Sequence, residues 1–290
     1  MKYRRFGLIG HPIAHSLSPA LFKAGYDGRY PYDLIETADF EEAYRRFLEG
    51  YDGINVTAPF KELAYGKADI LSEECKVVKA TNLLVKTPEG VKAFNSDFLG
   101  VRLWLEEILG ELSGDMTDSR FSPSAISPDN QPKWLNPTTL VVGLGGAGKA
   151  AAAAATSLDM NVILMNRNLD KAKSLAEVLG HRGHLTEIRP MSVFCQCFRD
   201  ADIIIYNIPT AIPQLEMLTD EDFAPGKPKL ILEANYKDPS FSEELLSRMK
   251  KVNPQAYYTG GRTWLLYQAM TGYEIFTGEN PDLAKMSAAL

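Results

Sequence analysis

The sequence predicts an α/β protein of two domains, and three observations support this prediction. Over about the first hundred of the 290 residues, short apolar runs alternate with amphipathic helical patterns, which is typical of a parallel sheet with right-handed crossovers. This periodicity is lost over residues 113–137, which are rich in Ser, Pro, Asp and Asn and are expected to form a long exposed loop. A second alternation of strands and helices starts at Thr139.

The first domain is expected to begin with three strand–helix pairs. The strands are the apolar runs at residues 6–9, 32–36 and 54–56. Ser18-Pro19 is a helix-start signal, Asp39 is expected to cap a helix at 40–49, and Pro59 ends the third strand before a helix from Phe60. A hairpin follows at 82–86 and 91–95, and Ser96 or Asp97 is expected to cap a helix that runs to about Leu112.

In the second domain, strands are expected at 140–142, 162–165, 203–206, 230–232 and 256–258, with helices between them. The last two helices, at 263–276 and from Pro281 onward, have no following strand and are expected to pack on the first domain. We therefore predict a discontinuous first domain, 1–97 with 260–290, and a second domain, 98–259, with the inserted loop at 113–137.

Composition and charge exclude several classes of function. The formal net charge of −6 argues against nucleic-acid binding, which needs a basic face. No apolar run is long enough for a secretory signal or a membrane span, so no membrane association is expected. Three cysteines cannot form a complete set of disulfides and suggest a reducing cytoplasm. Cys195-Gln196-Cys197 lacks the spacing of a zinc site even beside His181 and His184, so no metal is expected.

A glycine-rich turn predicts a dinucleotide site. The strand at 140–142 runs into Gly143-Leu144-Gly145-Gly146-Ala147-Gly148, and an alanine-rich helix begins there. This is the G-x-G-x-x-G pattern between a strand and a helix, where backbone N–H groups can approach a pyrophosphate. The sequence therefore predicts a Rossmann-type domain, with a purely structural glycine turn as the alternative.

The end of the next strand favours NADP over NAD. An NAD site usually has Asp or Glu about 20 residues after the glycines, where it binds the ribose 2′-hydroxyl. Here the strand ends in Asn166-Arg167-Asn168, and Lys171 follows one turn later. A guanidinium suits a 2′-phosphate, which a carboxylate would repel. The alternative is a solvated arginine at the start of a helix.

The segment from Asn55 to Lys61 predicts a ligand site in the first domain. Open α/β sheets bind ligands at the carboxyl ends of their strands, so Asn55, Thr57 and Lys61 are expected to face such a site. Lys61 also lies in the first turn of the expected helix, where the helix dipole favours a carboxylate over a positive charge. A solvated surface lysine remains the alternative for this segment alone.

Across both expected domains, the chain resembles the shikimate dehydrogenases over nearly its whole length. Seven segments match in order: His15 to Pro19, Asn55 to Glu62, Ala80-Thr81-Asn82, Asn95-Ser96-Asp97, the glycine loop, Asn166-Arg167, and Gly261 to Ala269. The resemblance implies an NADP-dependent oxidoreductase that interconverts 3-dehydroshikimate and shikimate in aromatic amino-acid biosynthesis. It is expected to be cytoplasmic and either a monomer or a homodimer.

The resemblance also implies roles for the domains and for individual residues. Residues 1–97 with 260–290 are expected to form the substrate-binding catalytic domain, and residues 98–259 the NADP-binding Rossmann domain. Lys61 and Asp97 match the paired catalytic residues of that family. The positions that match its substrate contacts are Ser16, Ser18, Asn55, Thr57, Asn82, Tyr236 and Gln268. Cofactor contacts are expected at Gly143, Gly145, Gly146, Ala147, Gly148, Asn166, Arg167, Lys171, Asn207 and Gly261.

These residue types suit the implied chemistry. A polyhydroxylated ring needs neutral hydrogen-bonding side chains, and hydride delivery to its ketone leaves an alkoxide that Lys61 could protonate. Asp97 would orient the ammonium group. The alternative for Asp97, and likewise for Ser18, is a plain helix N-cap, a role that Ser16 is not expected to have.

Several positions depart from the family pattern, mostly near the expected nicotinamide pocket. They are Lys79, Leu83, Pro209, Ile212, Arg262 and Trp264. Two rival functions therefore stay open: a quinate/shikimate dehydrogenase with relaxed cofactor use, and a non-catalytic NADP-sensing regulator on the same scaffold.

Overall fold

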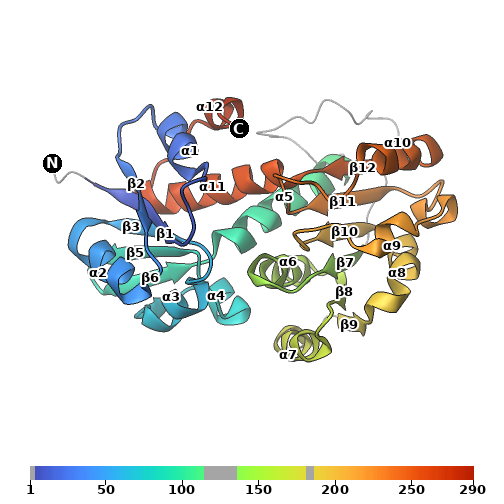
Figure 1. The fold of residues 1–290 in the computed structure, drawn as a ribbon, viewed down its shortest axis with the longest axis horizontal. Helices are drawn as coiled ribbons and strands as arrows, with labels where there is room; N and C mark the ends of the chain where they lie inside the picture. The colour runs from blue at the N-terminus through green and yellow to red at the C-terminus, as the bar shows by residue number, and fades with distance from the viewer. Residues whose placement is uncertain (1–3, 114–135, 181–185) are drawn as a thin grey trace. The chain divides into compact units, whose positions relative to one another are not determined.

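The structure is a computed structural model that describes residues 4–113, 136–180 and 186–290 (Figure 1). The chain divides into two compact units, residues 1–100 with 265–290 and residues 101–264. The domain boundaries expected from the sequence lie within a few residues of these, whereas the roles assigned to the two domains stay predictions. Most of the expected inserted loop, and both His181 and His184, lie outside the described residues.

The first unit is built on a six-stranded sheet with the order β2-β1-β3-β5-β6-β4. Its strands are β1 Phe6–Gly10, β2 Tyr32–Glu36, β3 Gly53–Val56, β4 Ile70–Leu71, β5 Leu83–Thr87 and β6 Gly90–Phe94. Strands β1, β2 and β3 are parallel, as predicted. The predicted hairpin forms β5 and β6, and β5 pairs antiparallel with β3. The sheet is therefore mixed rather than parallel throughout, because a tight turn reverses the chain.

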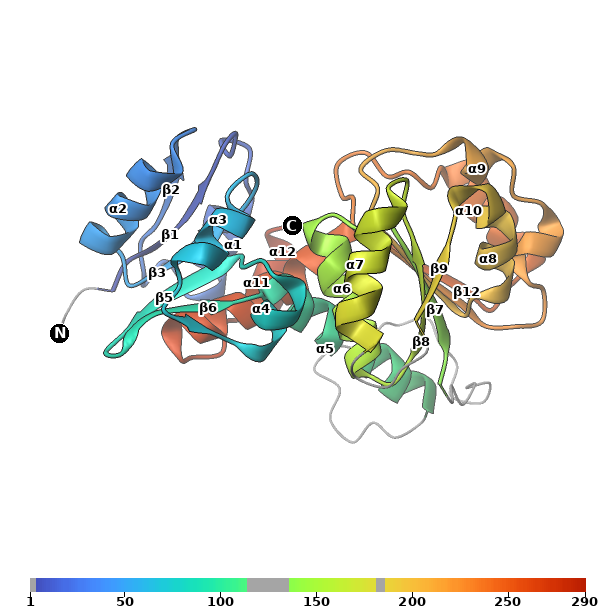
Figure 2. The ribbon, with the colours of Figure 1, turned by 90° about the horizontal axis from the view of Figure 1, so that it is seen from below.

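Helices cover both faces of this sheet (Figures 1 and 2). One face carries α2 Phe40–Gly50, α3 Lys61–Lys67 and α4 Glu73–Val78, and the other carries α1 Ser18–Gly25 and α11 Gly261–Thr277. The predicted cap Asp39 is confirmed, since its side chain accepts hydrogen bonds from the backbone N–H groups of Glu41 and Glu42. Helix α12, Leu283–Ala288, lies against α1, as the sequence led us to expect of the C-terminal helices.

The two faces of this sheet bury different side chains. Beneath α2 and α3 the core is mostly aliphatic and phenylalanine, including Ile9, Phe47 and Ile54, all of which are fully buried. Beneath α1 and α11 the contacts are aromatic: the Phe22 ring centroid lies 4.8 Å from that of Tyr32 and 4.8 Å from that of Tyr273. The second face therefore contains hydroxyl groups within an otherwise apolar layer.

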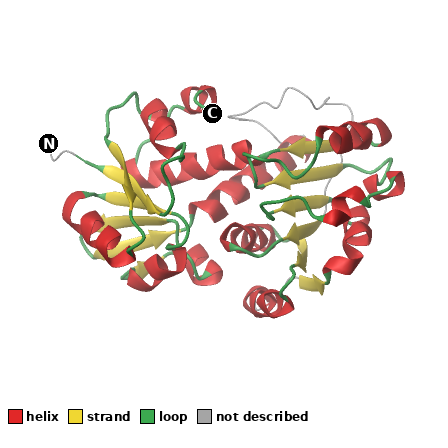
Figure 3. Cartoon of the chain, in the orientation of Figure 1, coloured by secondary structure: helices red, strands yellow, loops and turns green. Residues whose placement is uncertain are grey.

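The second unit contains a parallel sheet, drawn as yellow arrows in Figure 3. Its strand order is β12-β11-β10-β7-β8-β9 (Figure 1). Its strands are β7 Thr138–Val142, β8 Asn161–Met165, β9 Thr186–Arg189, β10 Ile203–Tyr206, β11 Lys229–Glu233 and β12 Ala256–Thr259. One face carries α6 Gly146–Ser157 and α7 Leu169–Gly180, and the other carries α8 Phe194–Asp200, α9 Pro213–Glu216 and α10 Glu243–Val252. This is the expected doubly wound arrangement.

Helix α5, Ser96–Ser113, begins differently from the expectation. The predicted caps were Ser96 or Asp97, but the Phe98 N–H donates to Oδ1 of Asn95 at 3.0 Å. Asn95 is therefore the N-cap, and Asp97 lies in the first turn of the helix instead. None of the helices in the described ranges combines the length and hydropathy of a membrane-crossing segment.

Candidate functional site

Lys61 and Asp97 form an ion pair in the first unit. Lys61 is the first residue of α3, and Asp97 is the second residue of α5. Lys61 Nζ lies 2.5 Å from Asp97 Oδ2, with side-chain exposures of 23% and 6%. The structure thus brings together the two predicted catalytic residues from elements that are far apart in the sequence. Because the Asp97 carboxylate is nearly buried, solvent screens the ion pair only weakly. The Lys61 ammonium group is partly exposed, so it can still contact a ligand.

A short segment between the two elements holds the pair in place. The Thr81 N–H donates to the Lys61 carbonyl at 3.1 Å. The next residue, Asn82, accepts from the Ser96 N–H at 2.7 Å and donates to Ser96 Oγ at 3.1 Å. Residues 81 and 82 therefore join the start of α3 to the start of α5. Asn82 is only 1% exposed, and both ends of its amide bond to Ser96, so its side chain is held rigidly beside the predicted site. Only one of its two N–H groups is used in these bonds, so the other can still donate to a ligand.

The two predicted serines lie next to each other at the start of α1. Ser16 Oγ lies 3.1 Å from Ser18 Oγ and accepts from the Ser18 N–H at 3.2 Å. The alternative role of Ser18 as a side-chain cap is wrong, because Ser18 is already the first residue of α1 and does not occupy its N-cap position. It is Ser16, for which no such role was expected, that satisfies the first backbone N–H. Two adjacent hydroxyls offer paired hydrogen bonds to a carboxylate or hydroxyl.

Asn55 and Thr57 lie at the carboxyl end of β3. Asn55 Oδ1 accepts from the Tyr32 hydroxyl at 2.7 Å, and its Nδ2 lies 3.4 Å from the Asn82 carbonyl. Thr57 is held by a backbone bond to Ile9, 3.0 Å long. The ends of β1 and β3 therefore place both side chains where open α/β sheets bind ligands.

Gln268 lies on α11 where this helix crosses α5. A side chain on Gly100 would come within 2.6 Å of the Gln268 backbone nitrogen, so only glycine permits the two helices to approach so closely. One turn further along α11, Gly272 lies against Ser96, and a Cβ there would be 3.2 Å from the Ser96 Oγ. Gln268 is therefore about one turn of α5 away from Asp97.

The glycine loop of the second unit has the geometry that a dinucleotide needs. Gly143 has φ +86°, a conformation that favours glycine. A Cβ on Gly148 would lie 1.8 Å from the Gly143 carbonyl oxygen, so the start of α6 packs directly on the loop. Gly145, Gly146 and Ala147 form the helix start, and a Cβ at Gly145 would meet nothing within 4 Å. The loop leaves room for a phosphate at the helix N-terminus, which fits a dinucleotide.

Asn166 connects the glycine loop to the predicted 2′-phosphate site. Its Oδ1 accepts from the Leu144 N–H at 3.2 Å, and its Nδ2 donates to the Asn168 carbonyl at 2.9 Å. Arg167 and Lys171 are both exposed, at the end of β8 and in the first turn of α7. Two cations beside the glycine loop, with no carboxylate at the end of β8, suit a phosphate better than a bare hydroxyl.

The other predicted residues of the second unit lie at the ends of β10, β11 and β12. Asn207 Nδ2 donates to the Ile205 carbonyl at 3.2 Å, and its buried Oδ1 has no hydrogen-bond partner among the described residues. A Cβ on Gly261 would lie 2.2 Å from the Ala234 carbonyl oxygen, so packing alone requires glycine there. Tyr236 is half-buried in the loop after β11 and thus belongs to a different unit from the other predicted substrate residues.

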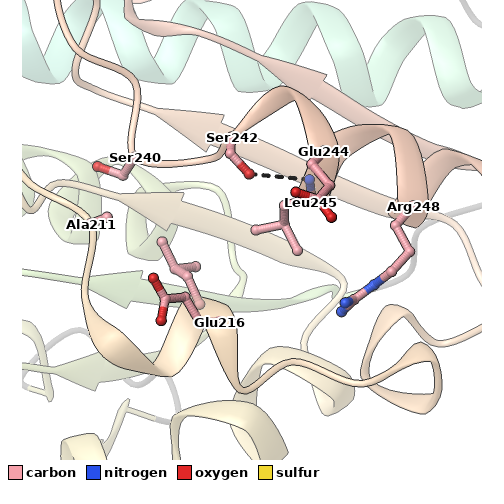
Figure 4. A pocket seen from close by; sticks show the side chains of 8 residues that line it. Ala211, Glu216, Ser240, Ser242, Glu244, Leu245 and Arg248 are labelled. Carbon is pink, nitrogen blue, oxygen red and sulfur yellow. Dashed lines mark hydrogen bonds between the residues drawn. The ribbon is translucent and has the colours of Figure 1, made fainter.

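A separate pocket of about 310 Å³ lies between α9 and α10 (Figure 4). Its lining includes Glu216, Ser240, Glu244 and Arg248. None of the predicted site residues lines it. Arg248 already pairs with Asp220 at 3.5 Å, so this arginine is not an open cation for a phosphate.

Sequence reasoning missed the residues that hold the site together. Tyr32, Thr81, Asn95 and Ser96 all make side-chain hydrogen bonds to or beside predicted site residues. Thr81, Asn95 and Ser96 lie in segments that match the family, but nothing in the sequence separates their structural roles from the roles predicted for Asn82 and Asp97. Tyr32 had no sequence signal, since its partner depends on strand order. Within the ranges described, no cluster of potential metal ligands is found.

Both units contain segments that match known protein families. Residues 8–84 match the family described as the shikimate dehydrogenase substrate binding domain, and residues 128–231 match the shikimate / quinate 5-dehydrogenase family. A shikimate dehydrogenase (NADP(+)) of Pasteurella multocida is 31% identical over 209 residues, covering 69% of this chain and 68% of the relative. One of Acinetobacter baumannii (strain AYE) is 29% identical over 289 residues, covering 97% and 98%.

The chain is also similar to solved structures of shikimate dehydrogenases over nearly its whole length. The shikimate dehydrogenase of Mycobacterium tuberculosis is 25% identical with a TM-score of 0.75, covering 99% of this chain and 98% of that one. The shikimate 5-dehydrogenase of Thermus thermophilus in complex with shikimate is 26% identical with a TM-score of 0.72, covering 99% and 97%.

Proposed function

The chain belongs to the shikimate dehydrogenase family, and from this we propose that it catalyses the reversible NADP-dependent reduction of 3-dehydroshikimate to shikimate. Its place is in aromatic amino-acid biosynthesis. The observation that carries the proposal is the Lys61–Asp97 pair, 2.5 Å apart, in the unit that matches the substrate binding domain. Both members of the pair argue against a non-catalytic sensor.

In this proposal Lys61 is the general acid. NADPH, when bound, supplies the hydride that reduces the ring ketone. The oxygen of that ketone gains negative charge as the reaction proceeds, and the Lys61 ammonium group stabilises it and donates the proton. In the reverse direction the same amine accepts the proton of the shikimate hydroxyl. Asp97 holds Nζ in place, so that no side-chain freedom has to be lost at the moment of reaction.

Neutral hydrogen-bonding groups surround the pair and suit a polyhydroxylated substrate. Ser16 and Ser18 present adjacent hydroxyls that fit its carboxylate and hydroxyl groups. The further proposed substrate contacts are Asn55, Thr57, Asn82, Gln268 and, from the second unit, Tyr236. Because these groups are uncharged, they can bind hydroxyls without burying an unpaired ion.

The second unit is proposed to hold NADP. The Gly143–Gly148 turn would receive the pyrophosphate at the start of α6, and Arg167 with Lys171 would pair with the 2′-phosphate. Asn166 fixes the spacing between these two regions through its bond to Leu144. Asn207 and Gly261 complete the proposed cofactor contacts. The free Cys75, Cys195 and Cys197 support a cytoplasmic location, and the assembly is proposed to be a monomer or a homodimer.

Initial rates of oxidation at alkaline pH test this function. Shikimate and quinate are each compared with NADP and with NAD, using equal enzyme concentrations. We expect the highest kcat/KM for shikimate with NADP. A higher kcat/KM for quinate would support the quinate/shikimate dehydrogenase, and NADPH binding with no turnover of either substrate would support the sensor.

A further inference from the structure

Tyr32 reaches across the sheet to a predicted substrate residue. Strands β2 and β3 flank β1, where Tyr32 is in register with Phe6 and Asn55 is in register with Leu8. The two side chains therefore lie on the same face of the sheet, on either side of the central strand. The Tyr32 hydroxyl donates to Asn55 Oδ1 at 2.7 Å.

The tyrosine is held firmly in this position. Its ring centroid lies 4.8 Å from that of Phe22 and 6.1 Å from that of Tyr273, which in turn donates to the Ser18 carbonyl at 3.0 Å. Burial raises the pKa of Tyr32 well above its ordinary value, although a hydrogen bond with the Ser18 side chain opposes the rise. Its hydroxyl therefore keeps its proton at neutral and alkaline pH and stays a hydrogen-bond donor.

This contact fixes which end of the Asn55 amide faces the site. With Oδ1 turned toward Tyr32, Nδ2 faces the Asn82 carbonyl at 3.4 Å. The flipped amide would place Oδ1 against that carbonyl, where two acceptors repel each other. Nδ2 has two N–H groups, and the long bond to Asn82 occupies only one of them. Asn55 can therefore offer an N–H donor to a ligand on the side of the amide that faces away from Tyr32.

We propose that Tyr32 is a positioning residue that sets the hydrogen-bonding polarity of Asn55, so that this amide donates to one hydroxyl oxygen of the substrate. The proposal rests on the proposed function and deepens it by naming what selects the hydroxylated ring. Without the tyrosine hydroxyl only the long contact with the Asn82 carbonyl orients the amide, so its donor is held less firmly toward that substrate hydroxyl.

The test compares Tyr32→Phe with a matched control, Tyr30→Phe. Tyr30 lies two residues away, and its hydroxyl donates to Glu279 Oε1 at an exposed position. Both variants keep the aromatic ring, and thermal unfolding verifies that both fold. Initial rates are measured with shikimate and with three analogues that each lack one ring hydroxyl.

For Tyr32→Phe we expect kcat/KM for shikimate to fall about 3- to 10-fold, mainly through KM, because one neutral hydrogen bond is lost from an oriented contact. With the one analogue that lacks the hydroxyl bound by Asn55, the variant and the wild type should react equally well. The Tyr32 hydroxyl also has a hydrogen bond with the Ser18 side chain. In an Asn55→Ala background the loss caused by Tyr32→Phe should therefore shrink to the small part that this second contact contributes. Tyr30→Phe should match the wild type throughout.

An equal loss with shikimate and all three analogues would show a merely structural role and overturn the inference. No loss with shikimate, or an undiminished loss in the Asn55→Ala background, would overturn it as well. Wild-type rates separate this result from the proposed function. If the wild type does not oxidise shikimate at all, both proposals fail; if it does, only the role of Tyr32 is at stake.

Discussion

Three asparagines near the predicted site have the same side chain but different roles. Asn95 caps α5 through Oδ1 and donates to the Ala80 carbonyl through Nδ2 at 3.0 Å, so it is structural. Asn82 is a buried strut to Ser96. Of the three, Asn55 alone has an amide end turned away from a strong protein partner. The sequence placed all three in matching segments, but it could not rank them, because the hydrogen-bond partners come from other strands and helices.

The pairing of Lys61 with Asp97 was predictable only through the resemblance. Their separation along the chain carries no periodic signal, and the bonds that bring them together pass through Thr81 and Asn82. By contrast, the local alternative for Asp97 as a cap could be stated from sequence and is now excluded by Asn95.

Arg167 tests the cofactor assignment at the scale of one residue. In Arg167→Gln we expect KM for NADP to rise roughly 10- to 100-fold, because a charge-assisted hydrogen bond to the 2′-phosphate is lost. KM for NAD should change little. The measurement is initial-rate kinetics with shikimate and each cofactor, and an equal rise for NADP and NAD would contradict the assignment to the 2′-phosphate.

At the scale of elements, fully buried strands were predicted well and partly exposed ones were not. The run at 203–206 is fully buried in β10, as its four apolar residues suggested. Strand β4 has two half-buried residues, and β9 alternates half-buried and exposed residues, so neither has a strong apolar signal. The mixed sheet of the first unit also escaped prediction. A hairpin can be recognised from its turn, but the strand that it joins depends on tertiary packing.

Lys229 joins β11 to the end of α8 in the second unit, and its burial predicts how stability depends on pH. This lysine, 2% exposed at the start of β11, donates to the Phe198 and Ala201 carbonyls at 2.6 Å, at the end of α8. Burial lowers its pKa to about 8, while Asp202 opposes that change. Between pH 8 and the ordinary value of 10.5, the unfolded chain therefore binds more protons than the folded chain, so stability rises with pH.

Denaturant unfolding of the wild type and of Lys229→Met at several pH values tests this. The variant should be less stable at every pH, because its carbonyl partners lose their donor. Between pH 8 and pH 10.5 the free energy of unfolding of the wild type should rise relative to that of the variant, by an amount of the order of 1–3 kcal/mol. The tyrosines that titrate at higher pH are common to both proteins and cancel in the comparison. A stability difference that is constant or shrinks as pH rises would contradict the lowered pKa.

At the scale of the whole molecule, the two chemical tasks are assigned to separate compact units. The proposed proton donor and most proposed substrate contacts lie in residues 1–100 and 265–290, whereas the glycine loop and Arg167 lie in residues 101–264. The sequence predicted this division because each domain has its own strand–helix alternation. A variant of the first unit should therefore leave NADPH binding intact.

The most direct test of the central claim is turnover by Lys61→Met, with Lys67→Met as its control. Lys67 lies on the same helix and pairs with Glu41 at an exposed position, so the control removes a similar charge. For Lys61→Met we expect kcat for shikimate oxidation to fall roughly 10²- to 10⁴-fold, because the general acid–base group is lost. NADPH affinity and the control's kcat should match the wild type. A near-normal kcat in Lys61→Met would contradict the account.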